Sequence, residues 1–126
     1  MNKIDSQVIV DIIRKRTGAK NALTQYQVAE EYYIETGEEI EPRTVRRIIG
    51  ELRFAGLPIL SSPHEPGGYF YPASRREYFD WKAREMAKAK KQIAKIEPVG
   101  IGVYRMFHRT AIQQAWDFGK KMLRVS

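Results

Sequence analysis

The spacing of the apolar residues changes at Gly56, and this change constrains the fold more than any other feature of the chain. Before Gly56, apolar residues recur at intervals of three and four in three separate stretches, as in amphipathic helices. After it, two short apolar runs flank the Pro- and Gly-rich segment 63–68, which is typical of a β-hairpin. The chain has 126 residues, 43% of them apolar, which is enough for one ordinary domain with an appendage. We therefore expect a mainly α fold with one small β-hairpin.

Start and stop signals bound the three predicted helices. A capping box at Thr24 and Gln27 begins the second helix, and Gly37 ends it. Pro42 occupies the first turn of the third helix, where proline is favoured, and Gly56 follows its end. These signals predict helices at residues 6–16, 25–36 and 42–55.

The hairpin and the tail follow. Two strands are predicted at 57–62 and 69–71, and the paired glycines at 67 and 68 supply the positive φ that the turn needs. Ser74 and Glu77 form a second capping box, which begins a long basic helix. The segment 99–103 contains two glycines and is predicted to be a hinge before a last helix at about 103–123. We accordingly divide the chain into a domain at residues 1–73 and a helical C-terminal extension at residues 74–126.

The net charge of +7 is concentrated in the extension. Residues 1–73 contain 9 Lys and Arg against 10 Asp and Glu, whereas residues 74–126 contain 13 against 5. Such a balance favours a polyanionic partner. Three lysines of the long helix, Lys88, Lys91 and Lys95, are candidate phosphate contacts, with a solvated helix surface as the other interpretation.

Enzymatic chemistry finds little support in the sequence. Cysteine is absent, which removes disulfides, thiolate metal sites and cysteine nucleophiles. The two histidines, His64 and His108, lie far apart, and no phosphate loop, serine elbow or metal-ligand spacing occurs. We expect no catalytic residues, no metal and no cofactor. With neither a membrane-spanning run nor an apolar signal segment after Met1, the expectation is a soluble cytoplasmic protein without a membrane partner.

Four segments carry a family resemblance. They are residues 24–29, residues 42–53, Gly56-Leu57-Pro58-Ile59 and Gly67-Gly68-Tyr69-Phe70-Tyr71. Together they resemble the winged helix-turn-helix domain of bacterial and phage DNA-binding proteins over residues 5–73. The resemblance implies three helices plus a hairpin wing and a double-stranded DNA partner. The linker 37–41 departs from the family pattern, because it is longer and more acidic than a tight helix-turn-helix turn.

The third helix holds the candidate DNA-reading residues. Four of its apolar residues are needed for a core, which leaves its arginines pointing outward or sideways. We assign Arg43, Thr44 and Arg47 to base edges, because a recognition helix reads bases with its N-terminal turns. Arg46 and Arg53 are assigned to phosphates, and so are three residues of the hairpin that would flank the helix, Ser61, Ser62 and His64.

Acidic residues of the second helix oppose a DNA-facing surface there. Glu31, Glu35 and Glu38 share one helical stripe. They lie either on the face away from DNA or in ion pairs with the basic tail, and the sequence leaves both arrangements open.

The apolar residues of the tail predict a partner. Phe79, Met86 and Ile93 repeat at seven-residue intervals. Ala89 and Ile96 occupy the alternate heptad position, which Lys82 interrupts, so the pattern is an incomplete coiled-coil heptad that would form a homodimer. The other interpretation is that Tyr78, Phe79 and Trp81 pack on the first domain. The last helix carries three further aromatic residues, Phe107, Trp116 and Phe118. These require the long helix folded back through the hinge, a second subunit or another protein.

The sequence therefore predicts a double-stranded DNA-binding protein without catalytic activity. A bacterial or phage transcriptional regulator is the first role. The alternatives are a phage or plasmid replication or packaging accessory protein, and a protein-interaction adaptor that does not bind DNA.

Overall fold

The computed structural model describes residues 3–125, except for the side chains of residues 109–112 and 121–125. The chain forms two compact units, at residues 1–84 and 85–126. It is mainly helical with one small two-stranded antiparallel sheet, as the sequence predicts. The elements are α1 (Ser6–Arg14), the 3₁₀ turn η1 (Ala19–Asn21), α2 (Gln25–Thr36), α3 (Pro42–Phe54), β1 (Leu60–Ser61), β2 (Tyr69–Phe70), α4 (Arg75–Ala94) and α5 (Ile96–Val125).

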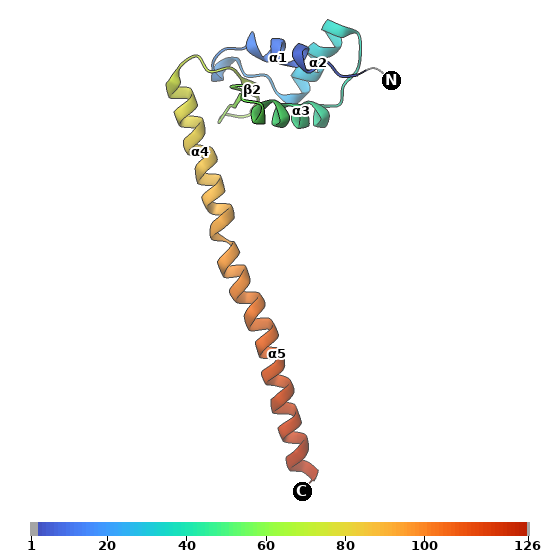
Figure 1. The fold of residues 1–126 in the computed structure, drawn as a ribbon, viewed down its shortest axis with the longest axis vertical. Helices are drawn as coiled ribbons and strands as arrows, with labels where there is room; N and C mark the ends of the chain where they lie inside the picture. Colours follow the sequence, from blue (N-terminus) through green and yellow to red (C-terminus); the bar gives the residue numbers. More distant parts are fainter. Residues whose placement is uncertain (1–2, 126) are drawn as a thin grey trace. The chain divides into compact units, whose positions relative to one another are not determined.

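The first unit is built on α1, α2 and α3, which pack around one apolar core (Figure 1). Each helix buries one stripe of apolar residues, because side chains three and four apart share a face. The buried residues of these helices are Ile9, Val10, Ile12, Ile13, Val28, Tyr32, Val45, Ile48 and Ile49. The predicted capping box is confirmed, since Thr24 accepts from the Gln27 amide and Gln27 accepts from the Thr24 amide.

The end of α3 explains why β1 is shorter than predicted. Gly56 adopts a φ of +95°, its amide donates to the Arg53 carbonyl, and the Leu57 amide donates to the Leu52 carbonyl. This is the Schellman arrangement that satisfies the last carbonyls of a helix. Leu57 therefore belongs to the helix terminus, and strand pairing with β2 begins only at Leu60.

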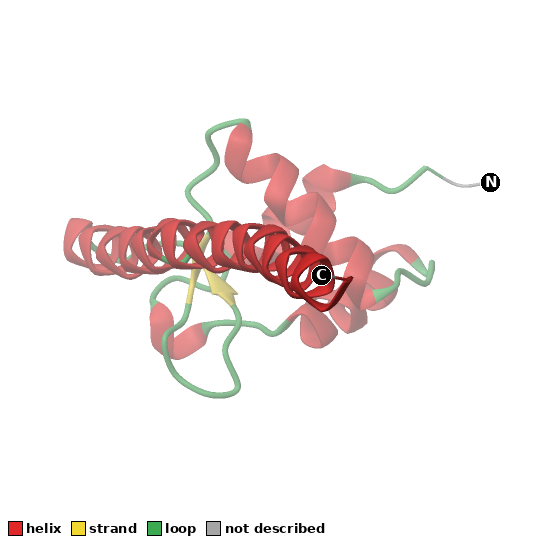
Figure 2. Ribbon diagram, turned by 90° about the horizontal axis from the view of Figure 1, so that it is seen from below, coloured by secondary structure: helices red, strands yellow, loops and turns green. Residues whose placement is uncertain are grey.

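The sheet, drawn as two short yellow strands in Figure 2, pairs with the segment between α1 and α2. In the hairpin, Leu60 pairs with Phe70 and Ser61 with Tyr69. Tyr69 also exchanges backbone hydrogen bonds with Leu23, at 2.7 and 2.9 Å. Tyr71, predicted as hairpin strand, pairs instead with the segment after α1, because its amide donates to Arg16 and its carbonyl accepts from Gly18. α1 itself ends at Arg14 rather than at the predicted residue 16.

Gly68 shows why the turn requires glycine. The predicted positive φ is confirmed at both turn glycines, +85° at Gly67 and +126° at Gly68. A Cβ at Gly68 would lie 2.7 Å from the carbonyl carbon and oxygen of Leu23. The backbone bonds between Leu23 and Tyr69 thus form only because this position has no side chain.

The beginning of α4 belongs to the first unit, which ends at Arg84, whereas the sequence analysis divided the chain after Ala73. Glu77 is one of the residues that attach the beginning of α4 to the first unit. Its carboxylate accepts from the Ala19 amide at 2.8 Å and from the Ala73 amide at 2.6 Å, so it ties α4 to η1. Ser74 Oγ accepts from the Glu77 amide, but no reciprocal bond to the Ser74 amide forms.

The predicted hinge at 99–103 is wrong. Gly100 and Gly102 lie inside α5, which begins at Ile96 rather than near residue 103. Each glycine costs a helix only about 1 kcal/mol relative to alanine, which is too little to end it. The only interruption between α4 and α5 is at Lys95, because Pro98 has no amide hydrogen to donate to the preceding turn. Within the described residues, no helix has the length and apolarity that a membrane span requires.

Candidate nucleic-acid interface

The outward face of α3 carries a stripe of four residues at intervals of four, three and four. They are Arg43, Arg47, Gly50 and Phe54, opposite the buried Val45, Ile48 and Ile49. Arg46 flanks this stripe on one side, and the half-buried Thr44 flanks it on the other. Burial of Val45, Ile48 and Ile49 fixes the rotation of α3 about its axis, so the core determines which side chains the helix presents.

Two arginines of this stripe have acidic partners. Arg43 Nε lies 2.6 Å from Glu41 Oε2, and Arg47 Nη1 lies 2.8 Å from Glu51 Oε1. All four side chains are exposed, and ion pairs of this kind contribute only about 0–1 kcal/mol. A phosphate or a base edge can therefore replace either carboxylate at little cost. Arg46 has no hydrogen bond or ion pair with any residue that the structure describes.

Gly50 and Phe54 are residues of this stripe that the sequence analysis did not name as candidates. The Phe54 side chain is 97% exposed, and a Cβ at Gly50 would meet nothing within 4 Å. The fold therefore gives no steric reason for a glycine at this helical position, although glycine lowers helix stability there. The available signal was the helical spacing, which puts both residues on the stripe of Arg43 and Arg47 rather than on the apolar face.

A hollow of about 550 Å³ borders the beginning of α3. Its lining includes three carboxylates, Glu30, Glu39 and Glu41, together with Tyr33 and Ile40. Phosphates are repelled from such a surface. The hollow itself is therefore unfavourable for a phosphate contact.

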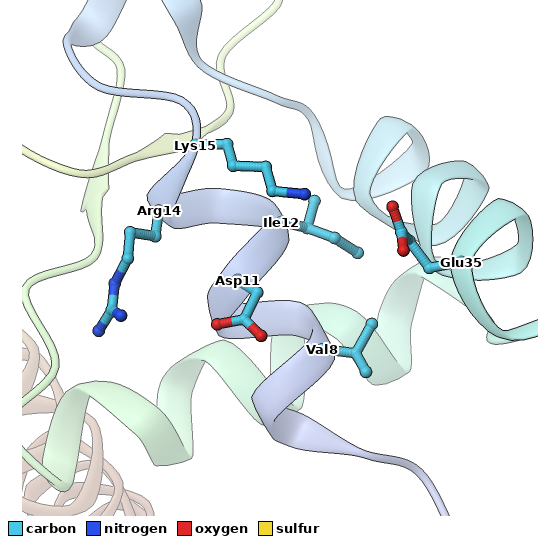
Figure 3. A pocket seen from close by; sticks show the side chains of 6 residues that line it. All are labelled: Val8, Asp11, Ile12, Arg14, Lys15 and Glu35. Atoms are coloured by element: carbon cyan, nitrogen blue, oxygen red, sulfur yellow. The ribbon is translucent and has the colours of Figure 1, made fainter.

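Two other acidic residues of α2, Glu31 and Glu35, lie near residues of α1 or of the segment that follows it. Glu31 lies 3.6 Å from Arg16, and Glu35 borders a pocket of about 290 Å³ between α1 and α2. Figure 3 shows Lys15 turned toward Glu35 across Ile12 in that pocket, while Arg14 points away. The lining also includes Asp11, whose Oδ1 accepts a hydrogen bond from Gln7 Nε2 at 2.9 Å.

Arg53 is engaged inside the first unit. Its Nε donates to the Ile59 carbonyl and its Nη2 to Ser61 Oγ, each at 2.7 Å. The guanidinium also lies over the rings of Tyr69 and Trp81, at 5.6 and 5.5 Å from their centroids. Arg53 thus links α3, the hairpin and α4, and the phosphate contact predicted for it stays a prediction.

The hairpin residues predicted to contact phosphate differ in their surroundings. Ser61 is occupied, because its carbonyl accepts from Arg84 Nη2 at 2.8 Å in addition to the bond from Arg53. Ser62 is half-buried, and its Oγ accepts from the His64 amide at 3.3 Å. His64 is exposed at the tip of the hairpin. Only His64 therefore offers a fully accessible side chain.

The second unit is strongly basic, with 9 Lys and Arg against 3 Asp and Glu. Lys88, Lys91 and Lys95 are exposed and lie on one stripe of the helix. Lys88 Nζ lies 3.2 Å from Glu85 Oε1, and an exposed ion pair of this kind contributes little to stability. The three predicted phosphate contacts of the tail are therefore accessible together.

The predicted partner residues of the tail are exposed as well. Phe79, Met86 and Ile93 are 57%, 52% and 67% exposed, and Phe107, Trp116 and Phe118 range from 61% to 65%. Of the aromatic residues at the start of α4, Trp81 is half-buried against Arg53, and Tyr78, which is 40% exposed, lines the same pocket as Trp81, whereas Phe79 is largely exposed. The hinge through which the last helix would fold back is absent, because Gly100 and Gly102 lie inside α5. Among the described residues, no group of three or more His, Asp or Glu side chains is arranged to hold a metal ion.

No protein-family model matches the chain, and neither a curated protein nor a solved structure matches it.

Proposed function

We propose that the chain is a double-stranded DNA-binding protein with a winged helix-turn-helix domain, acting as a bacterial or phage regulator of transcription. The observation that carries the proposal is the outward stripe of α3, where Arg43 and Arg47 stand beside the open position at Gly50. A major groove admits a helix of this kind, and arginine binds guanine O6 and N7 with two hydrogen bonds.

The connectivity of the first unit supports the same function. The hairpin follows α3 directly, and its returning strand pairs with Leu23, in the segment between α1 and α2. A winged helix has this order of elements. The hairpin then stands beside α3 as the wing, with His64 at its tip as a backbone contact.

The roles of individual residues follow from their positions. Arg43 and Arg47 read bases from the N-terminal half of the stripe, and Phe54 supplies an apolar contact of the kind that recognises a thymine methyl group. Arg46, at the flank, contacts a phosphate. Lys88, Lys91 and Lys95 add phosphate contacts that depend on salt and not on sequence.

A titration of the full chain tests this proposal. Fluorescence anisotropy with a mixed-sequence duplex, at about 50 mM and about 200 mM salt, should show an affinity that falls steeply with salt. A selection from random duplexes then supplies a preferred site. The Lys15→Ala variant is the control, because it removes an exposed charge just after the end of α1, outside the proposed interface. Absence of binding at both salt concentrations would contradict the proposal.

Two variants separate the assigned roles. Arg47→Ala should lower the preference for the selected site over random duplex by about 1–3 kcal/mol, because a base contact is lost. Arg46→Ala should weaken both duplexes equally and reduce the salt slope by about 1. Equal behaviour of the two variants would refute the division into base-reading and phosphate-contacting residues.

An adaptor function is the second candidate, and exposed aromatic side chains on α5 favour it. Trp116 and Phe118 are 61% and 65% exposed, more apolar surface than a helix usually leaves in water. An adaptor would bind little DNA at physiological salt and would lose its partner on Trp116→Ala. A replication or packaging role would keep the DNA affinity, so a reporter gene under the selected site separates it from transcriptional regulation.

A further inference from the structure

The second unit presents one apolar helix face that no described residue covers. Its largest side chains include Met86, Ile93 and Ile96, which are 52%, 67% and 66% exposed. Apolar surface on this scale favours association, because its transfer out of water is the main driving force for protein contacts.

The spacing of this face is that of a coiled coil. From Met86 onward the residues of this face recur at alternating intervals of three and four. They are Met86, Ala89, Ile93, Ile96, Gly100, Val103 and Phe107, of which Ala89 and Gly100 are small. Because the segment 99–103 is helical and not a hinge, the heptad continues beyond Ile96, where the sequence analysis ended it. Such a repeat forms the seam between two helices.

The interruption at Lys95 leaves this seam intact. Val99 donates its amide to the Lys95 carbonyl at 3.1 Å, so helical hydrogen bonding resumes within one turn. Pro98 lies two positions after Ile96 in the heptad, on the side away from the seam. Its ring therefore faces outward.

The charges beside the seam identify a second copy of the chain, in parallel orientation, as the partner. Lys88, Lys91 and Lys95 fall on the outer positions of the heptad, where they do not face a partner helix. The seam is flanked by Glu85 on one side and Lys90 on the other, five residues apart. In a parallel, in-register pair these two positions of opposite chains face each other, so the contact between opposite charges forms twice.

The following flanking pairs are compatible with the same register. The next pair joins Gln92 to Glu97 of the other copy, which brings no like charges together. The third joins Val99 to Tyr104, which extends the apolar seam. We propose that residues 85–107 form a parallel, in-register two-stranded coiled coil with a second copy of this chain.

Light scattering of the full chain without DNA tests the association. The mass should be twice the 14.7 kDa of the single chain, and it should fall on dilution. Ala89→Lys puts a charge in the seam and should raise the dissociation constant more than about tenfold, because the charge is buried without a partner. Ala87→Lys is the matched control, since the same substitution then lies outside the seam, and it should leave the mass unchanged.

Two further variants test the orientation. The chain has no cysteine, so Ile93→Cys introduces a single thiol, which oxidises to a cross-linked dimer only where Ile93 meets its own counterpart. Lys91→Cys, on the outer side, should not cross-link. Lys90→Glu should weaken the dimer through repulsion from Glu85, and the double variant Glu85→Lys/Lys90→Glu should restore it.

Three outcomes would overturn the proposal. They are a parent mass of 14.7 kDa at every accessible concentration, equal masses for Ala87→Lys and Ala89→Lys, and the absence of a cross-link in Ile93→Cys. Circular dichroism of each variant verifies that the helix is retained. Because DNA is absent from these measurements, their failure leaves the proposed DNA binding untouched.

Discussion

Arg53 donates from Nη2 to Ser61 Oγ at 2.7 Å, and this bond joins α3 to the first strand of the hairpin. The same guanidinium contacts the Trp81 ring of α4 at 5.5 Å from its centroid. One side chain thereby connects α3, the hairpin and α4. The position of the hairpin beside α3, on which the proposed interface depends, rests on this residue.

Replacing Arg53 should lower the stability of the first unit. Arg53→Ala removes two hydrogen bonds in a partly buried site and two aromatic contacts, so we expect a loss of about 1–3 kcal/mol in urea unfolding. Arg46→Ala is the matched control on the same helix and should change stability by less than about 0.5 kcal/mol. Equal effects of the two variants would show that the Arg53 contacts contribute nothing.

Gly50→Ala should separate stability from DNA binding. The added methyl group meets nothing within 4 Å, so the helix should gain about 1 kcal/mol. If DNA approaches α3 closely at this position, the same methyl group lowers the affinity for the selected duplex. Thermal unfolding and anisotropy on one preparation measure both quantities. A stabilised variant with the DNA affinity of the parent would place the DNA contact elsewhere.

Gly68→Ala should destabilise the first unit more than Gly67→Ala. Both positions have positive φ and incur a similar backbone strain of about 1–2 kcal/mol. Only at Gly68 would the new Cβ lie 2.7 Å from the Leu23 carbonyl group. The difference between the two unfolding free energies therefore measures the close contact between the hairpin and the α1–α2 segment, and a difference of zero would contradict it.

Glu77→Ala should loosen the beginning of α4. The carboxylate accepts from the amides of Ala19 and Ala73, and its removal leaves the part-buried Ala19 amide without this acceptor. We expect a loss of about 1–3 kcal/mol and faster hydrogen exchange at the Ala19 amide. Glu97→Ala is the control, because it removes a carboxylate of the second unit. Unchanged exchange at Ala19 would refute the anchoring role.

Local sequence signals predicted most of the helices and the turn, because caps and turn residues act on backbone groups only a few positions away. The capping box at Thr24 and Gln27 and the turn glycines at 67 and 68 act through neighbouring backbone groups, so their effect can be derived from spacing. The predicted range 25–36 agrees with α2 for the same reason. The glycines at 100 and 102 misled the prediction, since glycine in a helix is a cost and not a stop signal.

The sequence by itself determined the helices, the hairpin turn and the concentration of positive charge, because these depend on spacing and composition. Only the tertiary structure decided the environment of each side chain. It gave Arg53 a structural role between α3, the hairpin and α4, and it left Phe54 exposed beside Gly50. Such assignments depend on contacts between residues distant in the chain, and no local pattern encodes those distances.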